Sequence, residues 1–189
     1  MTSKDNSTRQ FIIDVARKKF MAEGYKATST RHIAKEVGIT QPNLYHHFKN
    51  KEALYISVLE QVGNEVNVQL NTIAHNSHLS TYERLSQMTR YLQENDPVDI
   101  YSMMKDMNSE LSEESKYKLY QIFLKGYKQP FIVLFESSLD RLRSGYTAES
   151  IASHYFIIIA PYISPDMLKH QVLPIENIID VFLHGILKD

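Results

Sequence analysis

Glycine and proline are scarce in this chain, which has six of each among 189 residues. These residues mark turns and helix ends, so their scarcity favours long helices over many short strands joined by turns. Hydrophobic residues make up 43% of the sequence, which is ample for a packed core. No internal repeat or hairpin pattern is visible. The sequence therefore predicts an all-α protein.

The lack of cysteine and of long apolar runs narrows the class of protein. Without cysteine the chain has no disulfides, thiolate metal sites or redox-sensing thiols. The longest apolar run, residues 155–160, is closed by Pro161 and is far shorter than the ~18 residues that span a bilayer. The polar N-terminal residues lack the apolar core of a signal peptide. We expect a cytoplasmic protein without a membrane partner.

Charge is distributed unevenly along the chain. Residues 1–60 hold 10 Lys and Arg against 6 Asp and Glu, whereas the remaining residues hold 11 against 16. Only the N-terminal part has a charge suited to a polyanion such as nucleic acid. We predict a module of residues 1–60, followed by a larger helical domain of residues 61–189.

The first helix of this module is expected to begin near Thr8. Ser7 and Gln10 have the spacing of a capping box, in which each side chain accepts a hydrogen bond from the other's backbone N–H. Gly24 is placed to end the helix in a left-handed turn. Apolar residues at helical spacing, Ile12, Val15, Ala16 and Phe20, form its buried face.

Two short helices follow, joined by a tight turn at residues 38–40. The hydroxyl cluster 28–30 caps the first of them, which buries Ile33, Ala34 and Val37. Thr40 caps the next, which tolerates Pro42 because first-turn amides need no helical partner. Its core residues are Leu44 and Phe48.

The spacing of these two helices is that of a helix-turn-helix. Small Ala34 lets them approach each other, Gly38 makes the turn, and Ile39 and Leu44 hold the pair together. In this motif the exposed N-terminal side of the later helix enters the major groove, while the earlier helix crosses the phosphate backbone. A fourth helix, capped by Asn50, completes the module.

A longer set of residues gives the motif a family resemblance. It consists of Ile33-Ala34, Gly38-Ile39-Thr40 and the run Leu44-Tyr45-His46-His47-Phe48-Lys49-Asn50-Lys51-Glu52-Ala53-Leu54. Together these resemble the TetR family of transcriptional regulators over roughly residues 8–60. The resemblance implies a homodimer that binds double-stranded operator DNA and a small-molecule effector. The rest of the chain matches the family only in being helical.

The resemblance also implies roles for single residues. Arg31, Gln41 and Pro42 would contact bases, with Asn43 added for its exposed amide, since arginine pairs with guanine edges and Gln or Asn with adenine. Tyr45, His46 and Lys51 would contact phosphates, although the family often has an aromatic ring at the position of His46. The predicted DNA-binding set is Arg31, Thr40, Gln41, Pro42, Asn43, Tyr45, His46 and Lys51.

No other chemistry is indicated by the motifs. His46 and His47 are adjacent on a helix and point about 100° apart, and no carboxylate or thiol stands at ligand spacing. We therefore predict no metal site and a packing role for His47. A nucleophile elbow, a phosphate-binding glycine loop and paired catalytic acids are all missing, so we predict neither catalysis nor a cofactor.

The larger domain has helical patterning throughout. We expect helices over residues 81–94, 98–108, 112–143, 148–163 and 175–187, with breaks at prolines and glycines. Pro130 lies within the longest of these segments and is expected to kink it.

Aromatic and methionine side chains are concentrated in this domain, which holds nine of the twelve tyrosines. Aromatic walls with hydroxyl groups and flexible thioethers suit an apolar or aromatic ligand. Plain core packing is the competing interpretation for each residue. The candidate pocket residues are Met88, Tyr91, Tyr101, Met104, Phe123, Tyr127, Phe131, Phe135 and Tyr155.

The last two predicted helices carry more apolar residues than one face of a monomer needs. They resemble the paired helices through which the family forms dimers, and Gly185 would permit close approach. Burial within the same subunit is the alternative. The candidate interface residues are Tyr155, Ile158, Ile159, Tyr162, Ile178, Ile179, Phe182, Leu183 and Ile186.

These observations predict a sequence-specific transcriptional regulator, most simply a repressor that a small apolar or aromatic ligand releases from its operator. Control by a protein partner is the alternative, and a fully packed C-terminal domain would favour it. An enzyme would require a convergent polar site in that domain.

Overall fold

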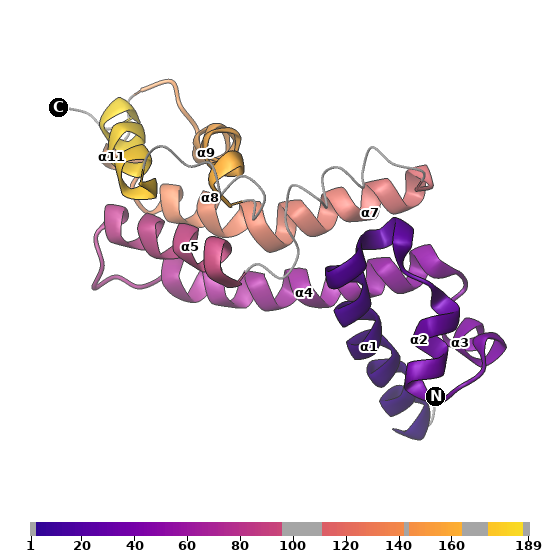
Figure 1. Cartoon of the computed structure of the whole chain (residues 1–189). Coiled ribbons are helices and arrows are strands. Elements are labelled where there is room, and N and C mark those ends of the chain that lie inside the picture. The colour runs from indigo at the N-terminus through magenta and orange to yellow at the C-terminus, as the bar shows by residue number, and fades with distance from the viewer. Residues whose placement is uncertain (1–2, 96–110, 142–143, 164–173, 187–189) are drawn as a thin grey trace. The chain divides into compact units, whose positions relative to one another are not determined.

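The structure, a computed structural model of the whole chain, describes residues 3–95, 111–141, 144–163 and 174–186 (Figure 1). Its regular elements in these ranges are helices, and it has no strand there, which confirms the all-α prediction. The described residues form two compact units. The first contains residues 3–62 and 111–120, and the second contains residues 63–95 and those from 121 onward.

Helix α1, Ser3–Ala27, begins earlier than the sequence predicts. Ser7 therefore lies inside the helix rather than at its cap, and the predicted capping box is wrong. The Gln10 amide instead donates to Asp14 Oδ1 at 2.9 Å and to Gln61 Oε1 at 2.8 Å. Gly24 has the expected positive φ of 76°, but its ψ of 169° is extended, so the chain kinks there and resumes helical structure to Ala27.

Helices α2, Thr30–Val37, and α3, Gln41–His47, form the predicted helix-turn-helix. Gly38 adopts the left-handed conformation, with φ 80° and ψ 25°, that ends α2 without the strain of a Cβ atom. The Thr40 side chain caps α3 by accepting a hydrogen bond from the Asn43 amide. Ile33, Ala34, Leu44 and Phe48 are buried as predicted, whereas Val37 is half-buried.

Helix α4, Lys51–Ala74, is capped as expected, since Asn50 Oδ1 accepts from the Ala53 amide at 2.8 Å. Its first part packs in the first unit through Leu54, Val58, Leu59 and Val62. Helix α7, Glu113–Phe123, begins in the same unit. Glu52 holds the start of α7 by accepting from Ser112 Oγ at 2.6 Å and Ser115 Oγ at 2.7 Å, and these bonds lower the pKa of the Glu52 carboxyl.

In the second unit, α7 continues into a π-helix, η1, Leu124–Lys128, and then into α8, Gln129–Glu136. The predicted single helix of residues 112–143 is therefore interrupted and ends early. A glycine contact accompanies the π-helix, because a Cβ on Gly126 would lie 2.8 Å from the carbonyl oxygen of Gly63. Asn67 Nδ2 on α4 also donates to the Lys125 carbonyl at 2.7 Å. Pro130 sits in the first turn of α8, where its missing amide is harmless.

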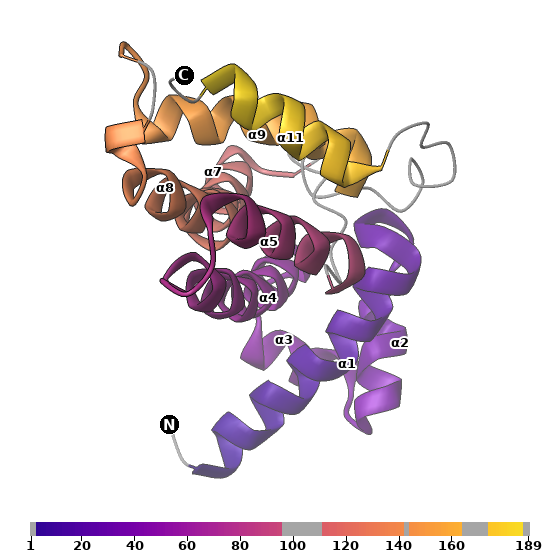
Figure 2. The same ribbon diagram turned by 90° about the vertical axis from the view of Figure 1, so that its left-hand side faces the viewer.

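Helix α5, Thr81–Asn95, closely matches its predicted bounds and starts with a capping box between Ser80 and Glu83. A 3-10 turn, η2, Leu139–Arg141, follows α8. Helices α9, Ala148–Ile163, and α11, Ile175–Ile186, both pack against α5 (Figure 2). The helix predicted over residues 98–108 lies outside the described residues. None of the described helices is long and apolar enough to cross a membrane.

Candidate nucleic-acid interface

Helix α3 separates its core residue from its outward residues. Leu44 is fully buried against the rest of the module, whereas Pro42, Asn43, Tyr45 and His46 are exposed. Gln41 is half-buried at the start of the helix, and Arg31 projects from the start of α2. Three of the predicted base-contacting residues, Gln41, Pro42 and Asn43, thus lie in the first turn of α3, and the fourth, Arg31, lies at the start of α2.

Gln41 and Tyr45 are held by one buried hydroxyl that the sequence pattern did not single out. Gln41 Nε2 donates to Thr30 Oγ1 at 3.0 Å, and Thr30 Oγ1 and Tyr45 Oη are also 3.0 Å apart. Thr30 is only 6% exposed. The prediction that a hydroxyl of residues 28–30 caps α2 is wrong, since the N-cap residue Ser29 makes no side-chain cap hydrogen bond. The role of Thr30 was missed because apolar periodicity carries no information about a hydroxyl partner on the next helix.

Lys51, the first residue of α4, is engaged within the module. Its ammonium lies 4.7 Å from the centroid of the Tyr25 ring and donates to the Lys26 carbonyl at 3.3 Å. Partial burial lowers the pKa of Lys51. An ammonium has three N–H donors, so these contacts orient the charge and leave donors for a phosphate.

The two histidines of α3 have different surroundings. His46 is exposed, whereas the His47 side chain is 9% exposed and its Nδ1 lies 3.3 Å from Asp5 Oδ1. His47 is therefore largely buried at the C-terminal end of α3, in keeping with the packing role expected for it. Among the described residues no group of His, Asp and Glu side chains has the arrangement of a metal site.

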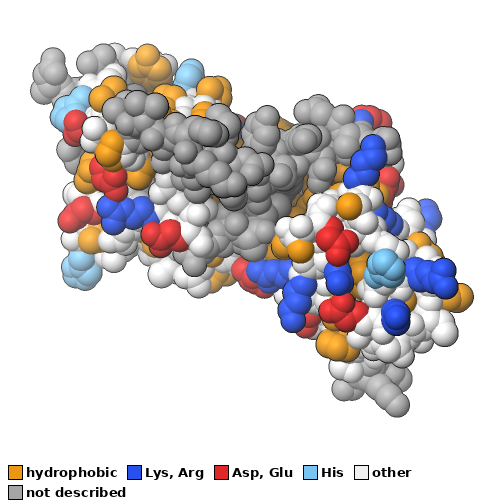
Figure 3. All heavy atoms as spheres, in the orientation of Figure 1, with side chains coloured by type: hydrophobic (Ala, Val, Ile, Leu, Met, Phe, Trp, Pro, Cys, Tyr) orange, Lys and Arg blue, Asp and Glu red, His pale blue; other side chains and the backbone are white. Residues whose placement is uncertain are grey.

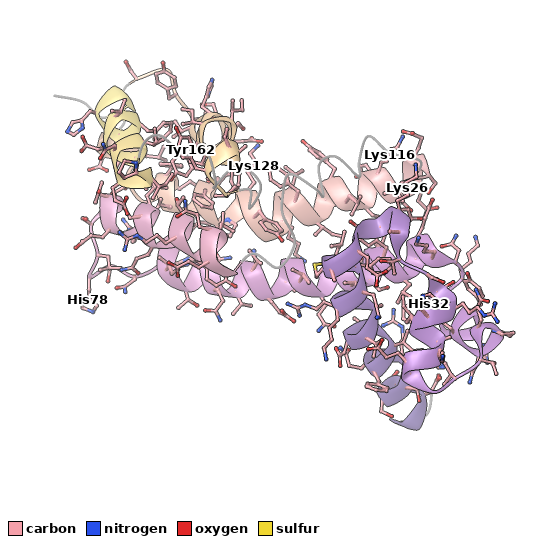
Figure 4. All side chains as sticks on the ribbon, viewed as in Figure 1. Lys26, His32, His78, Lys116, Lys128 and Tyr162 are labelled. Atoms are coloured by element: carbon pink, nitrogen blue, oxygen red, sulfur yellow. The ribbon has the colours of Figure 1, made fainter. Side chains whose placement is uncertain are left out.

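Basic side chains lie near the start of α2. Arg31, His32, Lys35 and Gln41 line one open hollow on the surface of the module. In Figure 3 many Lys and Arg side chains lie on the surface of the first unit, and Figure 4 labels His32 on α2. This positive surface adjoins the exposed face of α3 and is suited to phosphate groups.

The candidate pocket residues of the second unit lie mainly in its core. Met88, Tyr127, Phe131, Phe135 and Tyr155 are buried, and Tyr91 and Phe123 are half-buried. Their rings contact one another, with centroids 5.6 Å apart for Phe131 and Tyr155 and 6.4 Å apart for Phe123 and Tyr127. Two further candidates, Tyr101 and Met104, lie outside the described residues.

Tyr155 carries a deeply buried hydroxyl. Its Oη lies 2.6 Å from Thr89 Oγ1, and both residues are fully buried. Burial raises the pKa of Tyr155, because the phenolate oxygen would have little access to water when ionised. The hydroxyl is therefore neutral and already paired inside the unit.

The candidate interface residues fall on two sides of α9 and α11. Within the single chain, Tyr155, Ile159, Ile179, Phe182 and Leu183 are buried. Tyr162 and Ile178 are half-buried, Ile158 is 40% exposed, and the side chain of Ile186 is not described.

Two strongly exposed apolar residues were missing from the predicted interface set. Ile157 on α9 is 73% exposed and Val181 on α11 is 72% exposed. Ile157 lies within an unbroken apolar run, and Val181 is flanked by buried Phe182, so apolar character alone did not show which of these residues turn outward.

Comparison with known proteins relates the N-terminal part to one family. The sequence model of the bacterial regulatory proteins of the tetR family matches residues 12–58. The chain is 25% identical to the transcriptional regulator QacR of Staphylococcus aureus over 190 residues, which is 94% of this chain and 97% of that protein. It is 43% identical to the regulator AcrR of Shigella flexneri over 53 residues, 28% of this chain and only 25% of that protein.

Solved structures share the fold across both units. A TetR-family regulator of Mesorhizobium loti has a TM-score of 0.73 and 18% identity, with 99% of this chain and 100% of that chain covered. The regulator FadR of Bacillus subtilis, solved in complex with stearoyl-CoA, has a TM-score of 0.70 and 19% identity, with 93% and 95% covered. At these identities the likeness extends to the fold alone.

Proposed function

We propose that this chain, which belongs to the tetR family of bacterial regulatory proteins, is a homodimeric repressor of the cytoplasm that a small ligand releases from its operator. The observation that carries the DNA-binding part is the face of α3, where Gln41, Asn43 and Tyr45 stand out from a helix anchored by Leu44. A regulator of transcription needs such a face to read base edges while neighbouring cations neutralise phosphates.

Base reading is assigned to the start of the two motif helices. Gln41 and Asn43 have amides that can pair with adenine, and Arg31 can pair with guanine. Pro42 packs its ring against the groove, and Thr40 places the first turn of α3. Tyr45, His46 and Lys51 contact phosphates and fix the position of the module on the duplex.

Dimerisation is assigned to the outward face of α9 and α11. Ile157, Ile158 and Val181 are exposed apolar residues on these two helices. Pairing each helix with its copy would remove this surface from water, and it would place two recognition helices on one duplex as a symmetric operator requires. The predicted interface residues that are buried within the single chain would then pack beneath this interface and hold the two helices in place.

The effector is assigned to the second unit, and we expect it to be apolar or aromatic. The unit offers an aromatic core built by Phe123, Phe131 and Tyr155. FadR of Bacillus subtilis, which shares the fold, was solved with stearoyl-CoA, a ligand with a long apolar chain. SmeT, another protein of this fold, is the repressor of a multidrug efflux pump. The FadR complex supports an effector with a large apolar part.

The DNA-binding part is tested by selection from a pool of duplexes with randomised sequence. We expect the purified protein to enrich a two-fold symmetric sequence and to bind it about 10³- to 10⁷-fold more tightly than unselected duplex. Failure to enrich any sequence, with binding that depends only on salt concentration, would contradict sequence-specific regulation.

A further inference from the structure

Thr30 connects two of the proposed DNA contacts but is itself hidden from solvent. It is 6% exposed and lies at the first position of α2, opposite the start of α3. Its hydroxyl oxygen is 3.0 Å from Gln41 Nε2 and 3.0 Å from Tyr45 Oη. These are the two partners of Thr30 Oγ1 in the part of the chain that the structure describes.

Chemistry sets the direction of one of these hydrogen bonds and supports an assignment for the other. An amide nitrogen only donates, so Gln41 gives a proton to Thr30 Oγ1. Either hydroxyl can donate in the contact between Thr30 and Tyr45. We assign the donor to Thr30, because Tyr45 Oη is the acceptor within reach of its buried proton. Thr30 therefore donates to Tyr45. The proton of Tyr45 is left to point away from Thr30, at a residue that is 40% exposed.

We infer that Thr30 is a positioning residue that sets which groups Gln41 and Tyr45 present to DNA, an inference that rests on the proposed function. The held Gln41 amide presents its carbonyl and its second N–H, a pattern that matches the donor and acceptor on the major-groove edge of adenine. Guanine offers two acceptors there and matches this pattern less well. The outward proton of Tyr45 is the one that a phosphate oxygen requires.

The opposite orientation of the amide breaks this arrangement. With its carbonyl turned inward, Gln41 would accept the Thr30 proton, so Tyr45 would have to donate to Thr30 to keep the second bond. Tyr45 would then turn lone pairs toward a phosphate, which repels them. The phosphate contact of Tyr45 and the adenine preference of Gln41 are therefore linked through one hydroxyl.

Thr30→Val tests this role, because it removes the hydroxyl while keeping the branched shape of the side chain. Thr30→Ser restores the hydroxyl. Thr28→Val is the matched control, since Thr28 is a buried threonine of the same module whose hydroxyl donates to the Gly24 carbonyl at 2.7 Å and touches neither α3 residue. Each variant is put through the selection from randomised duplexes, and its thermal unfolding is recorded.

The base position read by Gln41 is identified first, as the position at which Gln41→Ala loses preference. There we expect the wild type to favour adenine over guanine and Thr30→Val to lose about 2- to 10-fold of this preference, the equivalent of one net hydrogen bond of about 0.5 to 1.5 kcal/mol. Thr30→Ser should retain the preference, and Thr28→Val should not alter it.

The results distinguish a failure of the positioning role of Thr30 from a failure of the proposed DNA-binding function. If the wild type enriches no sequence, the proposed function itself is wrong. If it enriches one, the positioning role is overturned by an unchanged adenine preference in Thr30→Val, by an equal loss in Thr28→Val, or by a Gln41→Ala variant that keeps every preference.

Discussion

The helix-turn-helix and the aromatic core of the second unit use the same kinds of side chain in opposite ways. In the first, Tyr45 is exposed and its hydroxyl is held from behind by a buried Thr30. In the second, Tyr155 is buried and its hydroxyl is held by the buried Thr89. Both tyrosines pair with a buried threonine, but of these two only Tyr45 is exposed and can contact a large external partner such as DNA.

Because of this difference, residue types predict function well in the helix-turn-helix and poorly in the second unit. On a short helix such as α3, a single anchor, Leu44, decides which residues face outward, so function follows from local spacing. In the second unit several helices cover one another, and an aromatic residue is equally suited to core packing and to ligand contact. Four measurements test this contrast, from the largest expected effect to the smallest.

The largest effect is expected at the outward face of α9 and α11. Val181→Glu places a charge on a residue that is 72% exposed in the single chain, where it would be buried in the proposed dimer. We expect a monomer by sedimentation and a loss of operator affinity of about 10²- to 10⁴-fold, because the two modules no longer bind as one.

The matched control for this change is Val68→Glu on α4, another exposed valine at 60%. It should remain a dimer with unchanged operator affinity. A dimeric Val181→Glu variant with wild-type affinity would show that this face is solvated, as in the single chain.

The next effect concerns the exposed face of α3. Gln41→Ala is expected to weaken operator binding by about 1 to 3 kcal/mol while binding to random duplex hardly changes, because a base-edge contact is made only with the right sequence. Fluorescence anisotropy with both duplexes measures the two affinities. Equal losses on the two duplexes would remove Gln41 from base reading.

A smaller effect is expected in the second unit. Tyr155→Phe removes the hydroxyl paired with Thr89, whose own hydroxyl keeps its bond to the Leu85 carbonyl at 2.8 Å. We expect the free energy of unfolding in urea to fall by about 0.5 to 1.5 kcal/mol. An unchanged stability together with a changed affinity for ligand would instead place this hydroxyl in a ligand site.

The smallest effect is expected at Lys51. Lys51→Ala should weaken operator and random duplex by similar factors and reduce the slope of log affinity against log salt by roughly one, as for one phosphate contact. Lys125→Ala, an exposed lysine of the second unit, changes the net charge equally and should leave the slope unaltered. Equal slopes for wild type and Lys51→Ala would rule out the phosphate contact.

The sequence predicted the helix-turn-helix correctly because its signals are local. Thr40 caps α3, Gly38 ends α2, and Leu44 is buried, each within a few residues of the feature it controls. Thr30 was missed because its partners lie on the next helix. The capping box of Ser7 and Gln10 was wrong because α1 begins at Ser3, which places Ser7 inside the helix.

In the second unit, tertiary packing overrode the local pattern. The long helix changes from π to α geometry directly before Pro130, and the π-helix meets α4 through Gly63 and Gly126. The apolar run 155–160 predicted a buried helix but not its inward side, and the exposed position of Ile157 emerged only from the packed unit. Neither the π-helix nor the exposed side of α9 can be predicted from the sequence of a single helix.

The central claim is that a ligand of the second unit controls the DNA affinity of the first, and linkage tests it most directly. An aromatic compound selected by thermal shift is titrated against the free protein and against its complex with the selected operator. We predict a ligand affinity about 5- to 150-fold lower in the complex, with the same factor lost in operator affinity when ligand is saturating. Equal ligand affinities in the two titrations would contradict the claim for that compound, because a ligand that does not distinguish two states cannot shift their balance.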